Sequence, residues 1–96
     1  MQINFQEQLV SFTGEGLKEG DQVITLGLIA CNALMNSTEE KMQGDEKVRR
    51  FDLATVIYAS TEAVDMKVED VALIKKLIGE MYGPVIVGPT WKLLDK

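Results

Sequence analysis

The sequence of 96 residues contains no histidine, one cysteine and two prolines. Without histidine, the chain lacks the commonest general base and the commonest metal ligand of proteins. The single thiol, Cys31, cannot form a disulfide within the chain or a CxxC metal pair. We therefore expect no disulfide scaffold, no histidine-dependent catalysis and no bound cofactor, and the lone thiol fits a reducing compartment.

Positive charge and long apolar runs are also scarce. Ten Lys and Arg residues face fifteen Asp and Glu residues, which gives a net charge of −5. Nucleic acids and anionic membranes need clustered cations, so both are disfavoured as the main partner. Apolar runs such as Leu28–Cys31 are far shorter than the roughly 20 residues that span a bilayer. The N-terminus has no basic region before an apolar run, so we expect no signal peptide and a cytoplasmic protein.

The remaining composition is that of an ordinary globular domain, with 46% hydrophobic and 26% charged residues. A chain of this length forms one domain, 1–96. In region 1–24, Ile3 and Phe5 alternate with polar neighbours, and two glycine-rich stretches interrupt short apolar segments. This pattern predicts a small N-terminal β-hairpin.

Region 25–96 has helical patterns. Thr25 is a predicted N-cap for an apolar helix over 26–36, and a helix that is apolar on nearly every side is normally buried. A polar connection follows, in which Ser37 and Glu40 have capping-box spacing. We expect the 26–36 helix to lie at the centre of the fold.

A second helix is predicted to begin at Asp45, which would cap it. Val48, Phe51, Thr55 and Tyr58 recur along it at helical spacing. Apolar residues also lie on its other faces. We therefore expect this helix to be covered on two sides.

The clearest pattern is the amphipathic segment Val64–Tyr82, with a loop over 59–67 leading into it. Its apolar positions from Val68 onward are Val71, Ile74, Leu77, Ile78, Met81 and Tyr82. Gly83 fits a helix C-cap and Pro84 fits the first position of a further helix. Segment 84–94 is either a kinked helix or a strand followed by a helix, and we favour the helix. The predicted fold is α+β and predominantly helical: a short N-terminal β-hairpin followed by a compact bundle of about four helices.

Few residues suggest reaction chemistry. Asp65, Glu69 and Asp70 lack the alternating ligands and central glycine of a calcium loop, so helix caps and a solvated face explain them better. Cys31 lies among Ile29, Ala30 and Ala33, which favours a buried, inert thiol. The glycines of 14–20 lack the Lys-Ser/Thr ending of a phosphate-binding loop. We predict no catalytic residue and no metal site.

Two sets of residues remain as candidate sites. Asn32 is a polar residue on a buried helix, and aromatic and methionine side chains dominate protein interfaces. The candidate interface residues are Asn32, Met81, Tyr82 and Trp91. The candidate anion patch consists of the two basic pairs, Arg49, Arg50, Lys75 and Lys76. For the first set the alternative is membership of the core, and for the second it is ordinary surface ion pairs.

The phrases TLGLIACNALM, GDEKVRRFDLATVIY and VEDVALIKKLIGEMYGPVIVGPTWKLL resemble, in layout, small acidic proteins encoded by tailed phages and prophages. The resemblance covers most of the chain through its apolar spacing. It implies a phage or prophage origin in a bacterial cytoplasm and a role in virion assembly or host takeover, and it implies no catalytic residue.

The sequence therefore predicts a non-enzymatic phage or prophage protein that binds another protein or a second copy of itself. The contact would use an apolar patch near the C-terminal segment or the hairpin edge. The alternative is a small regulatory protein that contacts DNA or the host transcription machinery through Arg49 and Arg50. A small enzyme is the least favoured class, because no pair of carboxylate, lysine or thiol groups is placed for catalysis.

Overall fold

The computed structural model describes residues 1–36, 39 and 41–95. Within these ranges the elements follow one another as β1 (Gln2–Ile3), β2 (Lys18–Glu19), β3 (Gln22–Val23), α1 (Leu26–Asn36), α2 (Gly44–Ala59), β4 (Val64–Asp65), α3 (Val68–Met81) and α4 (Pro84–Leu94). The predicted α+β class is confirmed: the fold is mainly helical and carries a short antiparallel hairpin near the N-terminus.

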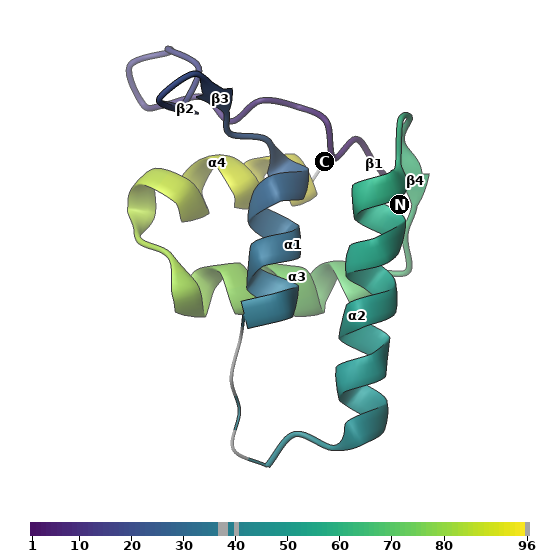
Figure 1. Ribbon diagram of the computed structural model, residues 1–96. Coiled ribbons are helices and arrows are strands. Elements are labelled where there is room, and N and C mark those ends of the chain that lie inside the picture. The colour runs from purple at the N-terminus through teal and green to yellow at the C-terminus, as the bar shows by residue number, and fades with distance from the viewer. Residues whose placement is uncertain (37–38, 40, 96) are drawn as a thin grey trace.

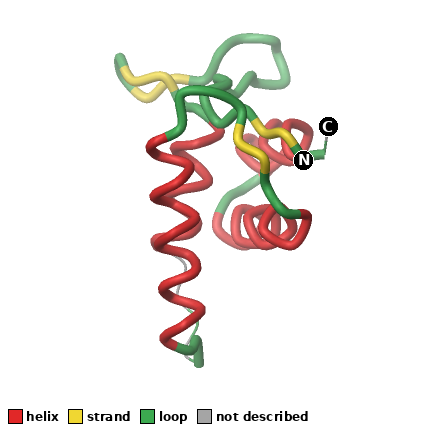
Figure 2. Tube along the Cα trace, turned by 90° about the vertical axis from the view of Figure 1, so that its right-hand side faces the viewer, coloured by secondary structure: helices red, strands yellow, loops and turns green. Residues whose placement is uncertain are grey.

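The four helices are arranged as two pairs. Helices α1 and α2 run side by side in opposite directions, and α3 crosses them at a steep angle (Figure 1). Figure 2 shows α3 and α4 together on one side of the α1–α2 pair, with the N-terminal region above it. On the opposite side of the α1–α2 pair the described chain has no further helix, and the β2–β3 hairpin lies above the end of the pair.

The N-terminal region is held to the helices by backbone hydrogen bonds. In β1 and β4, Ile3 pairs with Val64, a contact that joins the two halves of the chain. The β2–β3 hairpin turns at Gly20, which has a positive φ of 61°. Glycine adopts this conformation without the steric strain that a side chain would cause. The sequence indicated the hairpin but not β4, because 59–67 reads as a loop and a two-residue strand has no periodicity.

A single core lies between the helix pairs and the N-terminal segment. It consists of the buried residues Ile3, Phe5, Leu9, Leu26, Ile29, Ala30, Ala33, Leu34, Ala54, Ile57, Met66, Val71, Ile74, Leu77, Ile78 and Leu94. Helix α1 approaches the N-terminal segment closely at Gly27, whose amide donates to the carbonyl of Phe5 at 2.7 Å. A Cβ at Gly27 would lie 2.9 Å from that oxygen, so the contact requires glycine.

Helix starts agree only partly with the prediction. The Thr25 hydroxyl accepts a hydrogen bond from the Leu28 amide at 3.1 Å, as expected of an N-cap. Helix α2 begins one residue before Asp45, which lies in its first turn and accepts from the amide of Glu46. The N-cap position is Gln43, so the cap predicted at Asp45 is wrong by two positions. The capping box expected from Ser37 and Glu40 lies outside the described residues.

The prediction that α2 is covered on two sides is wrong. Val48, Phe51 and Tyr58 are 59%, 56% and 88% exposed, respectively. The buried stripe runs instead through Arg50, Ala54 and Ile57. Periodicity alone cannot rank two apolar stripes on one helix, and here α1 covers only one of them.

Helix α1 is also less enclosed than expected. Its inner face packs into the core, but Met35 near its end is 52% exposed and Cys31 is only partly buried. The reason is that neighbours cover α1 on the sides of α2 and α3 and leave its remaining side open. One side of this apolar helix is therefore exposed and forms part of an open surface.

The second half of the chain agrees closely with the prediction. Val71, Ile74, Leu77 and Ile78 form the buried face of α3. Pro84 stands at the start of α4, and 84–94 is one helix that contains Pro89. The strand alternative for that segment is therefore excluded.

Candidate protein-interaction surface

Cys31 lies at the seam between α1 and α2. Its Sγ donates a weak hydrogen bond to the carbonyl of Ala54, 3.5 Å away. Burial raises the pKa of the Cys31 thiol, because a thiolate would lose solvation there. A nucleophilic cysteine needs the opposite shift, so this thiol is placed for packing rather than for covalent chemistry.

The four candidate cations do not gather into one patch. Arg49 donates to Asp70 of α3 at 2.6 Å and also contacts Glu46. The hydrogen bond to Asp70 is the main reason that the pKa of Arg49 is raised. Together these contacts bind the cation of α2 to carboxylates on two helices.

The other candidate cations lie in two separate places. Arg50 is buried and contacts Glu39 and Glu46. Lys75 forms an ion pair with Asp95, whereas Lys76 is exposed on α3. Because carboxylates face three of the four cations, their charge is largely compensated within the chain.

The acidic residues near the start of α3 are also dispersed. Asp65 belongs to β4 and contacts the N-terminal amine, Glu69 is exposed, and Asp70 binds Arg49. In the part of the chain that the structure describes, no three Cys, Asp or Glu side chains gather where they could hold a metal ion. No described helix is both long and apolar enough to cross a bilayer.

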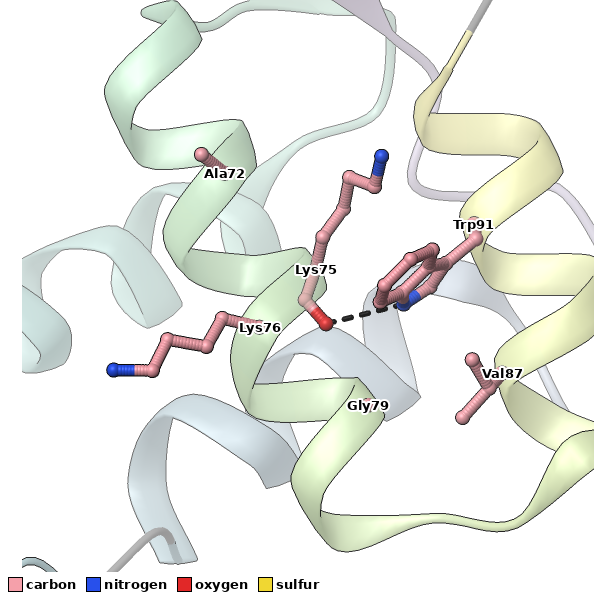
Figure 3. Close-up of a pocket in the computed structure, with 6 residues that line it drawn as sticks. All are labelled: Ala72, Lys75, Lys76, Gly79, Val87 and Trp91. Carbon is pink, nitrogen blue, oxygen red and sulfur yellow. Dashed lines mark hydrogen bonds between the residues drawn. The ribbon is translucent and has the colours of Figure 1, made fainter.

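The candidate interface residues of the sequence fall into different places. Trp91 lies against α3, where its indole N–H donates to the carbonyl of Lys75 at 3.1 Å (Figure 3). The Lys75 ammonium lies 4.7 Å from the centre of the ring, a cation–π contact. Met81 is 38% exposed at the end of α3, and Tyr82 and Asn32 are half-buried.

Trp91 borders a shallow groove of about 570 Å³ between α3 and α4. Figure 3 shows Ala72, Gly79 and Val87 along it and the Lys76 side chain turned away from the indole. Neither Met81 nor Asn32 lines this groove. The structure therefore gives Trp91 a packing role within the chain and does not join the four candidates into one surface.

A longer surface follows the open side of the α1–α2 pair. Its middle is an apolar hollow of about 310 Å³. The residues that line it are Cys31, Met35, Phe51, Ala54, Thr55, Tyr58 and Ala59. Small residues form its floor, and the large side chains of Phe51 and Tyr58 stand two helical turns apart along α2. None of the described residues that line this hollow carries a charge.

Further hollows continue this surface in both directions along the helix pair. One of about 380 Å³ shares Met35 and Phe51 and ends at the charged residues Glu39, Lys47 and Arg50. Another of about 430 Å³ shares Cys31 and Tyr58 and extends past Leu28 to the β2–β3 hairpin. We call the whole surface the α1–α2 groove; it is lined by the residues of these three hollows.

Comparison with known proteins adds no relative: no protein-family model, no curated protein and no solved structure matches the chain.

The α1–α2 groove was missed at the sequence level, although its signal was present. The sequence shows Phe51, Thr55 and Tyr58 at helical spacing and predicts that this helix is covered on two sides. A competing stripe of Arg50, Ala54 and Ile57 runs along the same helix. Arg50 on that stripe is buried, with Glu39 and Glu46 as its carboxylate partners.

Proposed function

We propose that this protein is a non-enzymatic binding protein that acts through protein–protein contact, with the α1–α2 groove as its contact surface. The observation that carries the proposal is the exposure of Phe51 and Tyr58 beside an uncharged hollow. Aromatic residues that surround an apolar centre, with charged residues at the rim, are the usual composition of a protein interface.

The chemistry of the site supports binding rather than catalysis. The thiol of Cys31 has a raised pKa, and Arg49 and Arg50 are each held in ion pairs with carboxylates of the same chain. Exposed apolar surface of this extent lowers solubility, so its presence favours a partner that covers it.

The role in virion assembly that the sequence resemblance implies would use such a surface, and it stays a prediction. The DNA-contacting alternative has less support. Its two arginines face carboxylates of the same chain, and phosphate binding would have to displace those partners.

Site-specific photocrosslinking tests this function. A benzoylphenylalanine replaces Tyr58 in the full chain, produced in the bacterial cells that naturally carry its gene. Phe12, which is 95% exposed away from the groove, provides a matched control position. We expect protein adducts after irradiation at position 58 and none at position 12. Equal adducts at both positions, or none at 58, would contradict the proposal.

A further inference from the structure

We infer that the occupant of the α1–α2 groove is a second copy of this chain, docked about a two-fold axis to form a four-helix interface. This inference rests on the proposed function and names the partner. Four arguments support it: the shape of the groove, its charge, the area available and the open side of the helix pair.

The shape of the α1–α2 groove is compatible with two-fold symmetry, because its large side chains are placed symmetrically about its small ones. Phe51 and Tyr58 project from α2, and Ala54 and Thr55 lie between them at the floor of the middle hollow. A two-fold axis between Ala54 and Thr55, with the two α2 helices antiparallel, places each Phe51 against Tyr58 of the partner subunit. The two aromatic side chains then pack against each other on each side of the axis, and the small residues Ala54 and Thr55 let the two helices approach at the axis.

The charge of the groove permits an identical partner. Each copy carries a net charge of −5, so two copies repel wherever carboxylates face each other. No charged residue is among the described residues that line the middle hollow. At the end of the groove, Glu39 and Lys47 provide both signs of charge. Two acidic chains can therefore meet at this face without burying like charges.

The available area is enough for a weak dimer. Aromatic side chains bury roughly 150–250 Å² each. Tyr58 and Phe51 are 88% and 56% exposed, and Met35 and Val48 are about half exposed beside them. Two such faces approach the total of about 1,000 Å² that a specific interface requires. We therefore expect dissociation constants in the micromolar range rather than the nanomolar range.

The arrangement of the helices leaves room for the second copy. Figure 2 shows α3 and α4 on one side of the α1–α2 pair, whereas the β2–β3 hairpin is the described element that extends to the other side, above the end of the pair (Figures 1 and 2). Two copies can approach with their helix pairs face to face. The result is a bundle whose core is formed by the side chains of the α1–α2 groove.

Sedimentation equilibrium of the purified full chain from about 1 μM to about 1 mM measures the association. We expect a monomer–dimer equilibrium, weakened about 100-fold or more by Phe51→Glu, because a carboxylate would be buried at the contact. Phe12→Glu, a matched change at an exposed phenylalanine off the groove, should leave the equilibrium unchanged. Circular dichroism checks that both variants keep their helices. A chain that stays monomeric at 1 mM, or a dimer that persists in Phe51→Glu, would overturn the inference.

Cysteine crosslinking tests the position of the axis. In a Cys31→Ser background, Thr55→Cys should form an intermolecular disulfide under mild oxidation. Val85→Cys, on the exposed surface of α4, should not. Efficient crosslinking at position 85 and none at position 55 would contradict the antiparallel arrangement.

The two proposals can fail separately. If the purified chain is a monomer but position 58 still crosslinks to a different protein in cells, the self-association is wrong and the binding function stands. If position 58 forms no adduct and the chain is a monomer, both are wrong.

Discussion

The indole ring of Trp91 lies directly against the backbone of Gly79. A Cβ built on Gly79 would lie only 3.0 Å from Cζ2 of Trp91, closer than side chains normally approach. The ring is fixed there by its hydrogen bond to the carbonyl of Lys75. Gly79 thus provides the space on α3 that lets α4 pack closely, although it costs helix propensity in α3.

Gly79→Leu is expected to displace the Trp91 ring. The added side chain occupies the position of the indole, so the hydrogen bond to Lys75 should break and the packing of α4 should loosen. We expect a loss of about 1–3 kcal/mol in the free energy of unfolding, measured with urea. Trp91 is the single tryptophan of the chain, so its fluorescence emission should shift to longer wavelength.

The control for this prediction is Gly44→Leu at the start of α2, where a Cβ meets nothing within 4 Å. This change should alter the free energy of unfolding by less than about 0.5 kcal/mol and leave the emission of Trp91 unchanged. If Gly79→Leu also leaves the emission unchanged, the close packing of Trp91 on α3 is wrong.

Arg50→Ala is expected to destabilise the fold more than the replacement of an exposed charged residue would. The guanidinium is buried and lies 3.0 Å from a carboxylate oxygen of Glu39 and 3.3 Å from one of Glu46. Its removal takes away a buried cation shared by the exposed Glu39 and the half-buried Glu46, together with the packing of its stem, and we expect a loss of about 2–3 kcal/mol in urea unfolding. Lys47→Ala, the same charge change at an exposed site on α2, should cost less than about 0.5 kcal/mol. Equal costs for the two variants would show that Arg50 is solvated.

The Cys31 thiol is expected to be unreactive in the native protein. Burial raises its pKa and limits access from one side, so reaction with an aromatic disulfide reagent at pH 8 should be about 10-fold slower than in the urea-unfolded chain. Comparable rates in the native and unfolded chains would contradict the shielding of this partly buried thiol at the α1–α2 seam.

The raised pKa of Cys31 also predicts how the stability of the protein changes at alkaline pH. The folded pKa of Cys31 lies above the unfolded value, so its contribution is complete below the unfolded pKa and is lost as pH rises through the folded pKa. The difference in free energy of unfolding between the wild type and Cys31→Ala should therefore be constant at neutral pH and shrink at alkaline pH. A difference that grows with pH would have the wrong sign.

The sequence was sufficient for the elements with one dominant apolar stripe. The face of α3 through Ile74 and Ile78 has no competitor on its helix, and Pro84 marks the start of α4 independently of packing. The pairing of β1 with β4 was not predictable, because two residues show no periodicity and the partners are far apart in the chain.

The groove could be predicted only in part. The helical spacing of Phe51, Thr55 and Tyr58 on α2 is visible in the sequence. Whether that stripe is buried depends on which other helix packs against it, and the sequence of α2 alone does not determine this. The candidates Met81, Tyr82 and Trp91 were chosen by residue type alone. Residue type cannot show that Trp91 finds its partner within the chain, at Gly79.

The neighbouring residues Ile57 and Tyr58 test directly which stripe of α2 faces the core. Ile57 is 3% exposed, so Ile57→Ala leaves a cavity and should lower the free energy of unfolding by about 2–5 kcal/mol. Tyr58 is 88% exposed, so Tyr58→Ala should change it by about 0.5 kcal/mol or less. Both are measured by urea unfolding at about 1 μM, where a micromolar dimer is mostly dissociated and adds little stability. A larger loss for Tyr58→Ala than for Ile57→Ala would mean that the outer stripe is the buried one, and the α1–α2 groove would then be closed.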